Sequence, residues 1–119
     1  MSNPYLRWMS KEDVLQHSVI LWLKYQHPAL RYHHSPDSGK RTPFEQFKYK
    51  YLGCDAGWPD LVFPSLNLAV ELKCKGNKPT PAQKGWLADL ESFGWQTAVC
   101  YSLEEVQEVI NANLKSKAA

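Results

Sequence analysis

Two short apolar segments, residues 60–64 and 68–74, are separated by only three residues, and this spacing constrains the fold more than any other feature. Parallel strands need a crossover of about a dozen residues or more, whereas antiparallel strands join through a short turn. We therefore expect two adjacent antiparallel strands. Because side chains alternate along a strand, the second presents apolar residues on one face and Ala69, Glu71 and Lys73 on the other.

Helix signals flank this strand pair. Ser10 with Asp13, and Thr80 with Gln83, are spaced as capping boxes, which mark the first turn of a helix. On the second helix we expect a buried stripe of Trp86, Leu87, Leu90 and Phe93. In chain order we expect a helix from Ser10 to His27, a strand at 30–34, a helix at 44–51, strands at 60–64 and 68–74, a helix from Thr80 to Gly94, a strand at 97–101 and a helix from Ser102. This order predicts an α/β fold with a central mixed β-sheet flanked by helices.

The composition narrows the class of protein. A length of 119 residues with 44% hydrophobic residues predicts a single domain over residues 1–119. A membrane-spanning helix needs about 20 apolar residues, and the apolar stretch at 18–23 is far too short, so we expect no membrane association. The three cysteines form no CxxC pair and, with His33 and His34, fit no zinc spacing. We expect reduced thiols in a cytoplasmic protein.

The charge is unevenly distributed although the net charge is only +2. Residues 1–84 hold 12 basic and 7 acidic side chains, whereas residues 85–119 hold 2 basic and 5 acidic ones. This asymmetry permits a phosphate-facing surface, and we predict phosphate contacts from Lys40, Arg41, Lys75 and Lys78. The alternative is an ordinary solvated charged surface.

The pattern Pro59-Asp60, followed by Glu71-Leu72-Lys73, indicates a candidate reaction centre. In adjacent antiparallel strands, the two carboxylates converge at one end of the sheet. Two carboxylates and a backbone carbonyl suit Mg²⁺, which prefers oxygen ligands. A lysine on the same face can orient a metal-bound water or offset charge on a phosphate. The alternative is a turn aspartate with a solvated strand face, but an acid in a central apolar strand is costly without a metal or a cationic partner.

The segments GCDAGWPDLVFP and LAVELKCKGNKPTPAQKGWLADLESFGWQTAVCYSLEEV resemble the virus-type replication-repair nuclease (VRR-NUC) family of the PD-(D/E)XK nuclease superfamily. The resemblance runs from about residue 12 to residue 110. Its strongest parts are Gly57-x-Pro59-Asp60-Leu61, Glu71-Leu72-Lys73 and Thr80-x-x-Gln83. It implies a restriction-endonuclease-like core of the standalone type found in phages and bacteria.

The resemblance also implies roles for individual residues. Asp60, Glu71 and the backbone carbonyl of Leu72 would hold Mg²⁺ or Mn²⁺, and Lys73 would be the catalytic lysine. These roles agree with the chemistry that the residue types indicate on their own.

Three further positions keep alternatives open. Gln83 would face the site from the next helix, but it is also the capping partner of Thr80, and the two roles compete. Family members often have a metal-approaching glutamate in the first helix. We assign Glu12 to that role, although a first-turn acid also complements the helix dipole. Trp58 either packs locally or contacts a base or sugar.

The resemblance favours a metal-dependent endonuclease that hydrolyses DNA phosphodiester bonds. A homodimer acting on branched DNA such as a Holliday junction is expected by family analogy, since two sites related by a two-fold axis can cut symmetric strands. The alternatives are a DNA-binding module that does not cut, or a subunit of a larger repair or phage complex. A binding module predicts a broken catalytic set, whereas Asp60, Glu71, Lys73 and Gln83 are all present.

Overall fold

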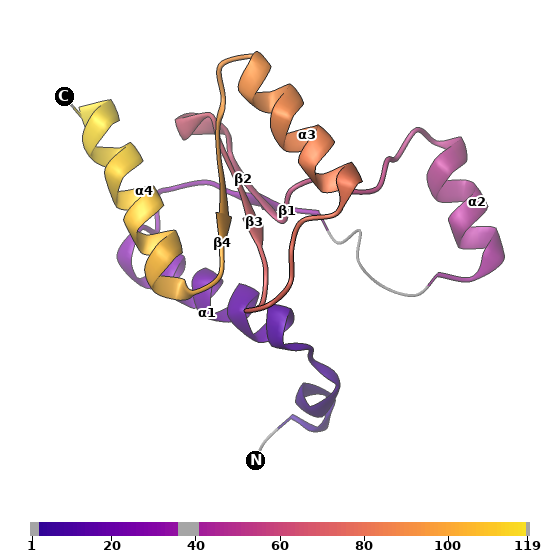
Figure 1. Cartoon of the computed structure of the whole chain (residues 1–119). Coiled ribbons are helices and arrows are strands. Elements are labelled where there is room, and N and C mark those ends of the chain that lie inside the picture. The colour runs from indigo at the N-terminus through magenta and orange to yellow at the C-terminus, as the bar shows by residue number, and fades with distance from the viewer. Residues whose placement is uncertain (1–2, 36–40, 119) are drawn as a thin grey trace.

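A mixed β-sheet lies at the centre of the chain, and helices cover both of its faces (Figure 1). The structure is a computed structural model that describes residues 3–35 and 41–118. The elements are η1 (Pro4–Trp8), α1 (Lys11–Gln26), β1 (His33–His34), α2 (Pro43–Tyr51), β2 (Leu61–Phe63), η2 (Pro64–Leu66), β3 (Leu68–Leu72), α3 (Pro81–Ser92), β4 (Gln96–Cys100) and α4 (Leu103–Ala118). The predicted α/β class and order of helices and strands are confirmed.

The register of the sheet positions the polar residues of the strand pair. In the described residues the strand order is β1-β2-β3-β4, with β2 antiparallel to β1 and β3, and β3 parallel to β4. Leu61 of β2 lies opposite Val70 of β3. Extending this antiparallel register by one residue places Asp60 opposite Glu71.

The main core lies on one face of the sheet, where α1 and α4 pack. Buried side chains of these helices meet one face of β3, and this set comprises Val19, Leu23, Leu68, Val70, Leu72, Val106 and Ile110. Burying each Val, Leu or Ile contributes about 1.5–3 kcal/mol. The alternate residues Ala69 and Glu71 therefore face the other side, which α3 covers.

Side-chain caps begin the helices at the predicted positions. Ser10 and Asp13 form a reciprocal capping box at α1, and Thr80 and Gln83 form one at α3. Ser102 accepts a hydrogen bond from the Glu105 amide at the start of α4. These bonds satisfy backbone amides that have no partner in the first turn of a helix.

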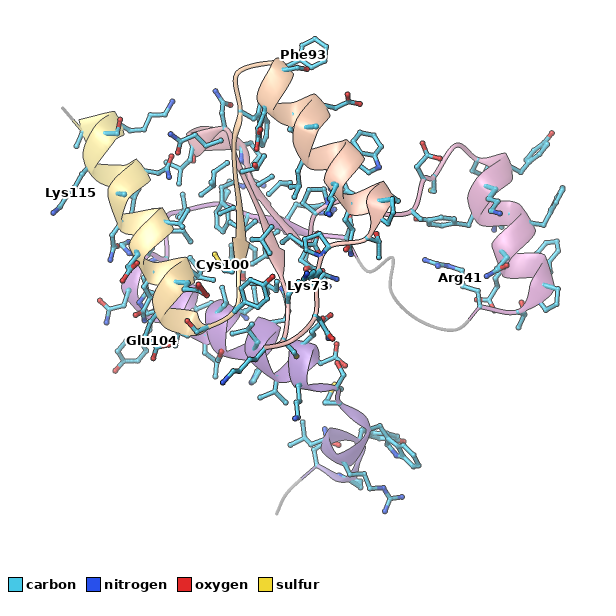
Figure 2. All side chains as sticks on the ribbon, in the orientation of Figure 1. Arg41, Lys73, Phe93, Cys100, Glu104 and Lys115 are labelled. Atoms are coloured by element: carbon cyan, nitrogen blue, oxygen red, sulfur yellow. The ribbon has the colours of Figure 1, made fainter. Side chains whose placement is uncertain are left out.

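The predicted burial of Phe93 is wrong. Its side chain is 84% exposed and projects from the end of α3 away from the sheet (Figure 2). The helix ends at Ser92, and Phe93 has the non-helical torsions φ −100° and ψ 15°. Helical periodicity turns Leu87 toward the core. Because Phe93 lies beyond the end of the helix, this periodicity does not determine where its side chain points.

Helix α2 differs from the other α-helices, α1, α3 and α4, because it buries none of its residues. It stands apart from the sheet (Figure 1). Several of its apolar side chains are exposed, namely Phe44, Phe47 and Tyr51, as is Leu52 at its end.

The two longest helices, α1 and α4, each have 16 residues. Over 3–35 and 41–118, no helix has both the length and the apolar character needed to cross a membrane.

Candidate active site

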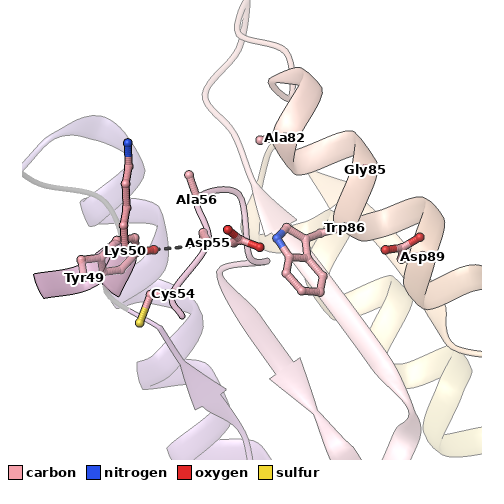
Figure 3. Close-up of a pocket in the computed structure, with 9 residues that line it drawn as sticks. All are labelled: Tyr49, Lys50, Cys54, Asp55, Ala56, Ala82, Gly85, Trp86 and Asp89. Atoms are coloured by element: carbon pink, nitrogen blue, oxygen red, sulfur yellow. Dashed lines mark hydrogen bonds between the residues drawn. The ribbon is translucent and has the colours of Figure 1, made fainter. Parts of the chain in front are cut away.

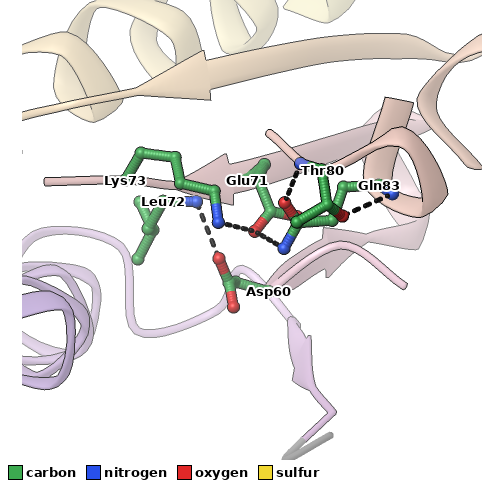
Figure 4. A network of polar contacts seen from close by, with 6 residues as sticks. All are labelled: Asp60, Glu71, Leu72, Lys73, Thr80 and Gln83. Carbon is green, nitrogen blue, oxygen red and sulfur yellow. Dashed lines mark hydrogen bonds and ion pairs between the residues drawn. The ribbon is translucent and has the colours of Figure 1, made fainter. Parts of the chain in front are cut away.

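Glu71 is a carboxylate buried in the middle of the sheet, with only 2% of its surface exposed. Its neighbours in β3, Val70 and Leu72, are apolar, so its negative charge must be stabilised by polar groups from other parts of the chain. Glu71 Oε1 accepts a hydrogen bond from Gln83 Nε2 at 3.2 Å and lies 3.9 Å from Lys73 Nζ (Figure 4). A buried acid with a cation and an amide donor is typical of a reaction centre.

Asp60 lies immediately before β2 and reaches across to β3. Its Oδ2 accepts a hydrogen bond of 2.7 Å from the backbone amide of Leu72 (Figure 4). This bond continues the strand pairing with a side chain in place of a backbone carbonyl. The structure thus brings Asp60 and Glu71 to one end of the strand pair, with the Leu72 peptide between them.

Lys73 comes directly after β3, and a backbone hydrogen bond to β4 fixes its position. Its amide donates to the Cys100 carbonyl at 3.0 Å, which extends the pairing of β3 with β4. The Lys73 side chain is only 10% exposed, so its ammonium group lies within the site. Desolvation strengthens its attraction to the Glu71 carboxylate.

Gln83 performs both of the roles that we expected to compete. Its Oε1 accepts a 2.8 Å hydrogen bond from the Thr80 amide, while its Nε2 donates to Glu71. The two roles are compatible because an amide side chain has an acceptor and a donor on separate atoms. The cap therefore orients the amide group that contacts Glu71.

Gly57 brings the loop before Asp60 against the first turn of α3. It has a positive φ of 94°, and a Cβ there would lie 2.6 Å from the Ala82 carbonyl carbon and 2.8 Å from the Gln83 nitrogen. Only glycine fits both this conformation and this close approach. The glycine of the sequence motif thus connects the Asp60 loop to the helix that carries Gln83.

His34 is a residue of the site that sequence reasoning missed. Its Nδ1 lies 2.8 Å from the Asp60 backbone oxygen. A carbonyl oxygen can only accept, so the Nδ1 carries the proton and donates it. The sequence gives no signal for the contact between His34 and Asp60, because the two residues lie 26 positions apart.

A small cavity of about 40 Å³ lies beside Asp60. It is lined by Glu12, Asp13 and Gln16 of α1, together with His34, Asp60 and Leu72. The Nε2 atom of Gln16 is buried there without a hydrogen-bond partner in the described residues. The first helix therefore contributes to the surroundings of Asp60, and Glu12 lies at this cavity.

The oxygen atoms of the site suit a hard divalent cation. Two carboxylates, Asp60 and Glu71, lie at one end of the strand pair and offer only oxygen donors, as Mg²⁺ and Mn²⁺ prefer, and the Leu72 carbonyl is the third oxygen that the sequence predicts. Across the described part of the chain, no three His, Cys, Asp or Glu side chains gather in a metal-binding group. A metal here would accordingly keep water in its remaining positions, which is usual for Mg²⁺.

Comparison with known proteins agrees with this fold. A family model described as the VRR-NUC domain matches residues 2–104. The chain belongs to the VRR-NUC family. A solved structure titled "VRR_NUC domain protein" is 31% identical, covers 90% of this chain and 90% of its own, and has a TM-score of 0.72. Among curated proteins, no match is found. The VRR-NUC assignment makes this a nuclease-type domain, with the predicted restriction-endonuclease-like core.

The predicted phosphate contacts of this VRR-NUC chain lie in two places. Arg41 lies before α2, with its guanidinium 4.1 Å from the centre of the Tyr49 ring. Lys75 and Lys78 are exposed in the connection between β3 and α3. Lys40 lies outside the described residues. The two exposed lysines lie two and five residues after Lys73 along the chain.

Trp58 packs locally, which is one of the two alternatives left open by the sequence. Its ring meets Trp86 edge to face, with centroids 4.9 Å apart and an interplanar angle of 83°. Trp86 is half-buried rather than a full core residue. This pair fixes the loop before Asp60 against α3, close to the Gly57 contact.

The cysteines do not contribute to the site. Cys54 is exposed, Cys74 is half-buried and Cys100 is buried. Burial, with a smaller effect of Glu105, raises the pKa of the Cys100 thiol to about 11. Cys100 therefore remains a neutral thiol packed in the core.

Proposed function

We propose that this chain is a metal-dependent endonuclease that hydrolyses DNA phosphodiester bonds, within a single domain over residues 1–119. One observation is central to the proposal. The buried Glu71 carboxylate contacts Lys73 and Gln83. The Asp60 carboxylate accepts a hydrogen bond from the backbone amide of Leu72, the residue after Glu71. A purely structural role does not explain why a central strand should contain a buried carboxylate and be followed by a buried lysine.

Asp60, Glu71 and the Leu72 carbonyl are the proposed ligands of Mg²⁺ or Mn²⁺, with Glu12 as a further approaching acid at the cavity beside Asp60. The cation, when bound, supplies positive charge that stabilises charge developing on the phosphate oxygens. The Leu72 amide holds the Asp60 carboxylate in place, so that little reorganisation is needed on binding.

Lys73 and Gln83 are the proposed catalytic residues on the α3 side of the site. Lys73 places an ammonium donor beside Glu71, where it binds a phosphate oxygen or orients the attacking water. Gln83 restrains the Glu71 carboxylate through Nε2 and is itself restrained by the helix cap. The rigid arrangement favours the geometry needed for in-line attack.

DNA is the proposed partner, and branched DNA such as a Holliday junction is the proposed substrate. The exposed cations Lys75 and Lys78, together with Arg41 and Lys40, are the proposed phosphate contacts. A homodimer would present two sites related by a two-fold axis, which suits paired cuts in a symmetric junction. The exposed apolar side chains of η1 and α2 provide surface for such an assembly.

The test is cleavage of a labelled four-way junction and a matched linear duplex, with Mg²⁺, Mn²⁺ or EDTA. Asp60→Asn keeps an acceptor for the Leu72 amide but removes the charge, and Lys73→Ala removes the ammonium group. We expect each to lower metal-dependent cleavage about 10³-fold. The control, Lys115→Ala, changes an exposed lysine on α4 (Figure 2) and should cut like the wild type.

The outcomes separate the parts of the proposal. Equal cutting of both DNAs would remove the preference for branched substrates but keep the chemistry. A wild-type protein that binds DNA and cuts nothing with either metal would establish the non-catalytic binding module instead.

A further inference from the structure

A second cavity, of about 640 Å³, lies between α2 and α3 (Figure 3). One wall comes from α2 and the loop after it, with Tyr49, Cys54 and Asp55. The other wall comes from α3, with Gly85, Trp86 and Asp89. The proposed chemistry at Glu71 uses none of these side chains, so this cavity needs a separate explanation.

Gly85 is the most informative residue of the cavity. It lies in the middle of α3, where glycine is the least favourable residue except proline. Its φ is not positive, and a Cβ built on it has nothing within 4 Å among the described residues. Neither backbone conformation nor internal packing requires a glycine here. Its presence leaves open space on the cavity wall, as the close approach of a ligand requires.

The aromatic residues of the walls are held in defined positions. Trp86 is held by its edge-to-face contact with Trp58. Tyr49 donates its hydroxyl hydrogen bond to the Asp55 backbone oxygen at 2.9 Å, and Arg41 lies over its ring. Restrained aromatic rings are the usual platforms for unpaired bases, because every base has a flat face that stacks.

The charges around the cavity indicate which part of a nucleotide would enter. Asp55 and Asp89 line it and would repel a phosphate. Carboxylates do accept hydrogen bonds from the amino and imino groups on base edges. Cations lie at the α2 side, where Lys50 lines the cavity and Arg41 covers Tyr49. This arrangement suits a base inside and its phosphate near α2.

The cavity is also adjacent to the proposed reaction centre. Ala82 lines it, and the next residue, Gln83, contacts Glu71. Gly57 holds the loop of the opposite wall against the same turn of α3. A nucleotide in the cavity would therefore belong to the strand whose phosphate lies at Glu71.

We propose that the cavity between α2 and α3 binds one unpaired nucleobase of the DNA strand placed at the Glu71 site. This inference rests on the proposed nuclease function and adds a physical source of preference for branched DNA. Fully paired DNA has no free base to insert, whereas branched DNA with a single-stranded arm or end exposes unpaired bases that enter at lower cost.

The test uses binding in EDTA, so that its result is independent of cleavage. The probes are a blunt DNA hairpin and the same hairpin with one unpaired 2-aminopurine at its end. The decisive variant is Gly85→Leu, which fills the open space while replacing glycine with a good helix former. Ala88→Leu is the matched control, because Ala88 is exposed on the same helix and does not line the cavity.

We expect the wild type to prefer the hairpin with the unpaired base and to quench its fluorescence by stacking. Gly85→Leu should weaken binding of that hairpin about ten-fold, consistent with losing one stacked base, and leave the blunt hairpin unchanged. Its melting temperature should equal or exceed that of the wild type, which separates the effect from misfolding. Ala88→Leu should bind both hairpins normally.

The proposal is overturned if Gly85→Leu binds the unpaired hairpin like the wild type, or if the wild type shows no preference for it. A preference that persists in EDTA without any cleavage in Mg²⁺ or Mn²⁺ would support the base site and refute the proposed hydrolysis. The two proposals therefore fail by different measurements.

Discussion

Helices α2 and α3 begin with nearly the same local sequence but lie in different environments. Thr42-Pro43-x-Glu45 opens α2, and Thr80-Pro81-x-Gln83 opens α3. Both form a reciprocal capping box with proline in the first turn. The cap is therefore a local device, which needs only a hydroxyl and an acceptor three residues apart.

The difference lies in what the third residue does after capping. Glu45 caps α2, which buries none of its residues. Gln83 caps α3 with Oε1 and also donates from Nε2 to the buried Glu71. A carboxylate at position 83 would have no donor for this second contact. One side chain thus connects a local helix signal to the candidate active site.

Exchanging these two residues is expected to affect both cleavage and stability. Gln83→Glu keeps the cap acceptor, removes the donor to Glu71 and places a second carboxylate against it. We expect cleavage to fall about 10²-fold and the free energy of unfolding to fall by about 2 kcal/mol. DNA cleavage and urea denaturation measure the two effects. The matched exchange Glu45→Gln should leave cleavage unchanged and should lower the free energy of unfolding far less, because Glu45 is exposed and contacts no buried group. Equal effects of the two exchanges would contradict the distinction between the helices.

Gly57→Ala tests why α3, rather than α2, lies against the Asp60 loop. The added Cβ would meet the backbone of Ala82 and Gln83, and the positive φ adds strain. We expect a loss of about 3 kcal/mol in the free energy of unfolding. Gly53→Ala is the control at the end of α2, where φ is also positive but nothing lies within 4 Å. It should cost about 1 kcal/mol. Similar losses would show that close packing at α3 is unimportant.

A third prediction concerns His34, which contacts the backbone of Asp60. His34→Ala removes the donor to the Asp60 carbonyl and should lower stability by about 1 kcal/mol. Because Asp60 loses a restraint, we expect a several-fold lower cleavage rate with unchanged DNA affinity. His34→Asn retains a donor close to the Nδ1 position and should recover most of the rate. If Asn and Ala behave alike, the hydrogen bond does not position Asp60.

The smallest expected effect concerns the pH response of the two caps. Hydrogen bonds from the Thr42 backbone and side chain hold the pKa of Glu45 below its ordinary value. The charged form is thus favoured in the folded state, so this contribution is present near neutral pH and lost as the pH falls through the lowered pKa. Gln83 does not titrate. Amide NMR shifts should show an acid transition at Thr42 and none at Thr80. A shared midpoint would contradict this assignment.

Much of this architecture follows from the sequence because its signals are local. The three-residue connection predicts the antiparallel pair, and alternation places Glu71 and Lys73 on one face. The capping boxes of α1 and α3 need only contacts across three residues. The box of Thr42 and Glu45 at the start of α2 has the same spacing and is equally local. Phe93 was misplaced because helical periodicity does not say where the helix stops.

The sequence by itself determined the α/β order of elements, the helix starts and the residue types that the candidate site would use. The sequence left two roles for Gln83 in competition, and only the tertiary structure decided that it caps its helix and contacts Glu71 at the same time. Only the tertiary structure decided that His34 reaches Asp60, 26 residues later. It also decided that α2 remains exposed and that Gly85 borders an open cavity. The physical reason is the distance along the chain over which each interaction acts. A helix cap or the alternation of side chains along a strand depends on residues a few positions apart. Contacts between distant segments depend on how whole faces of helices and sheet pack together.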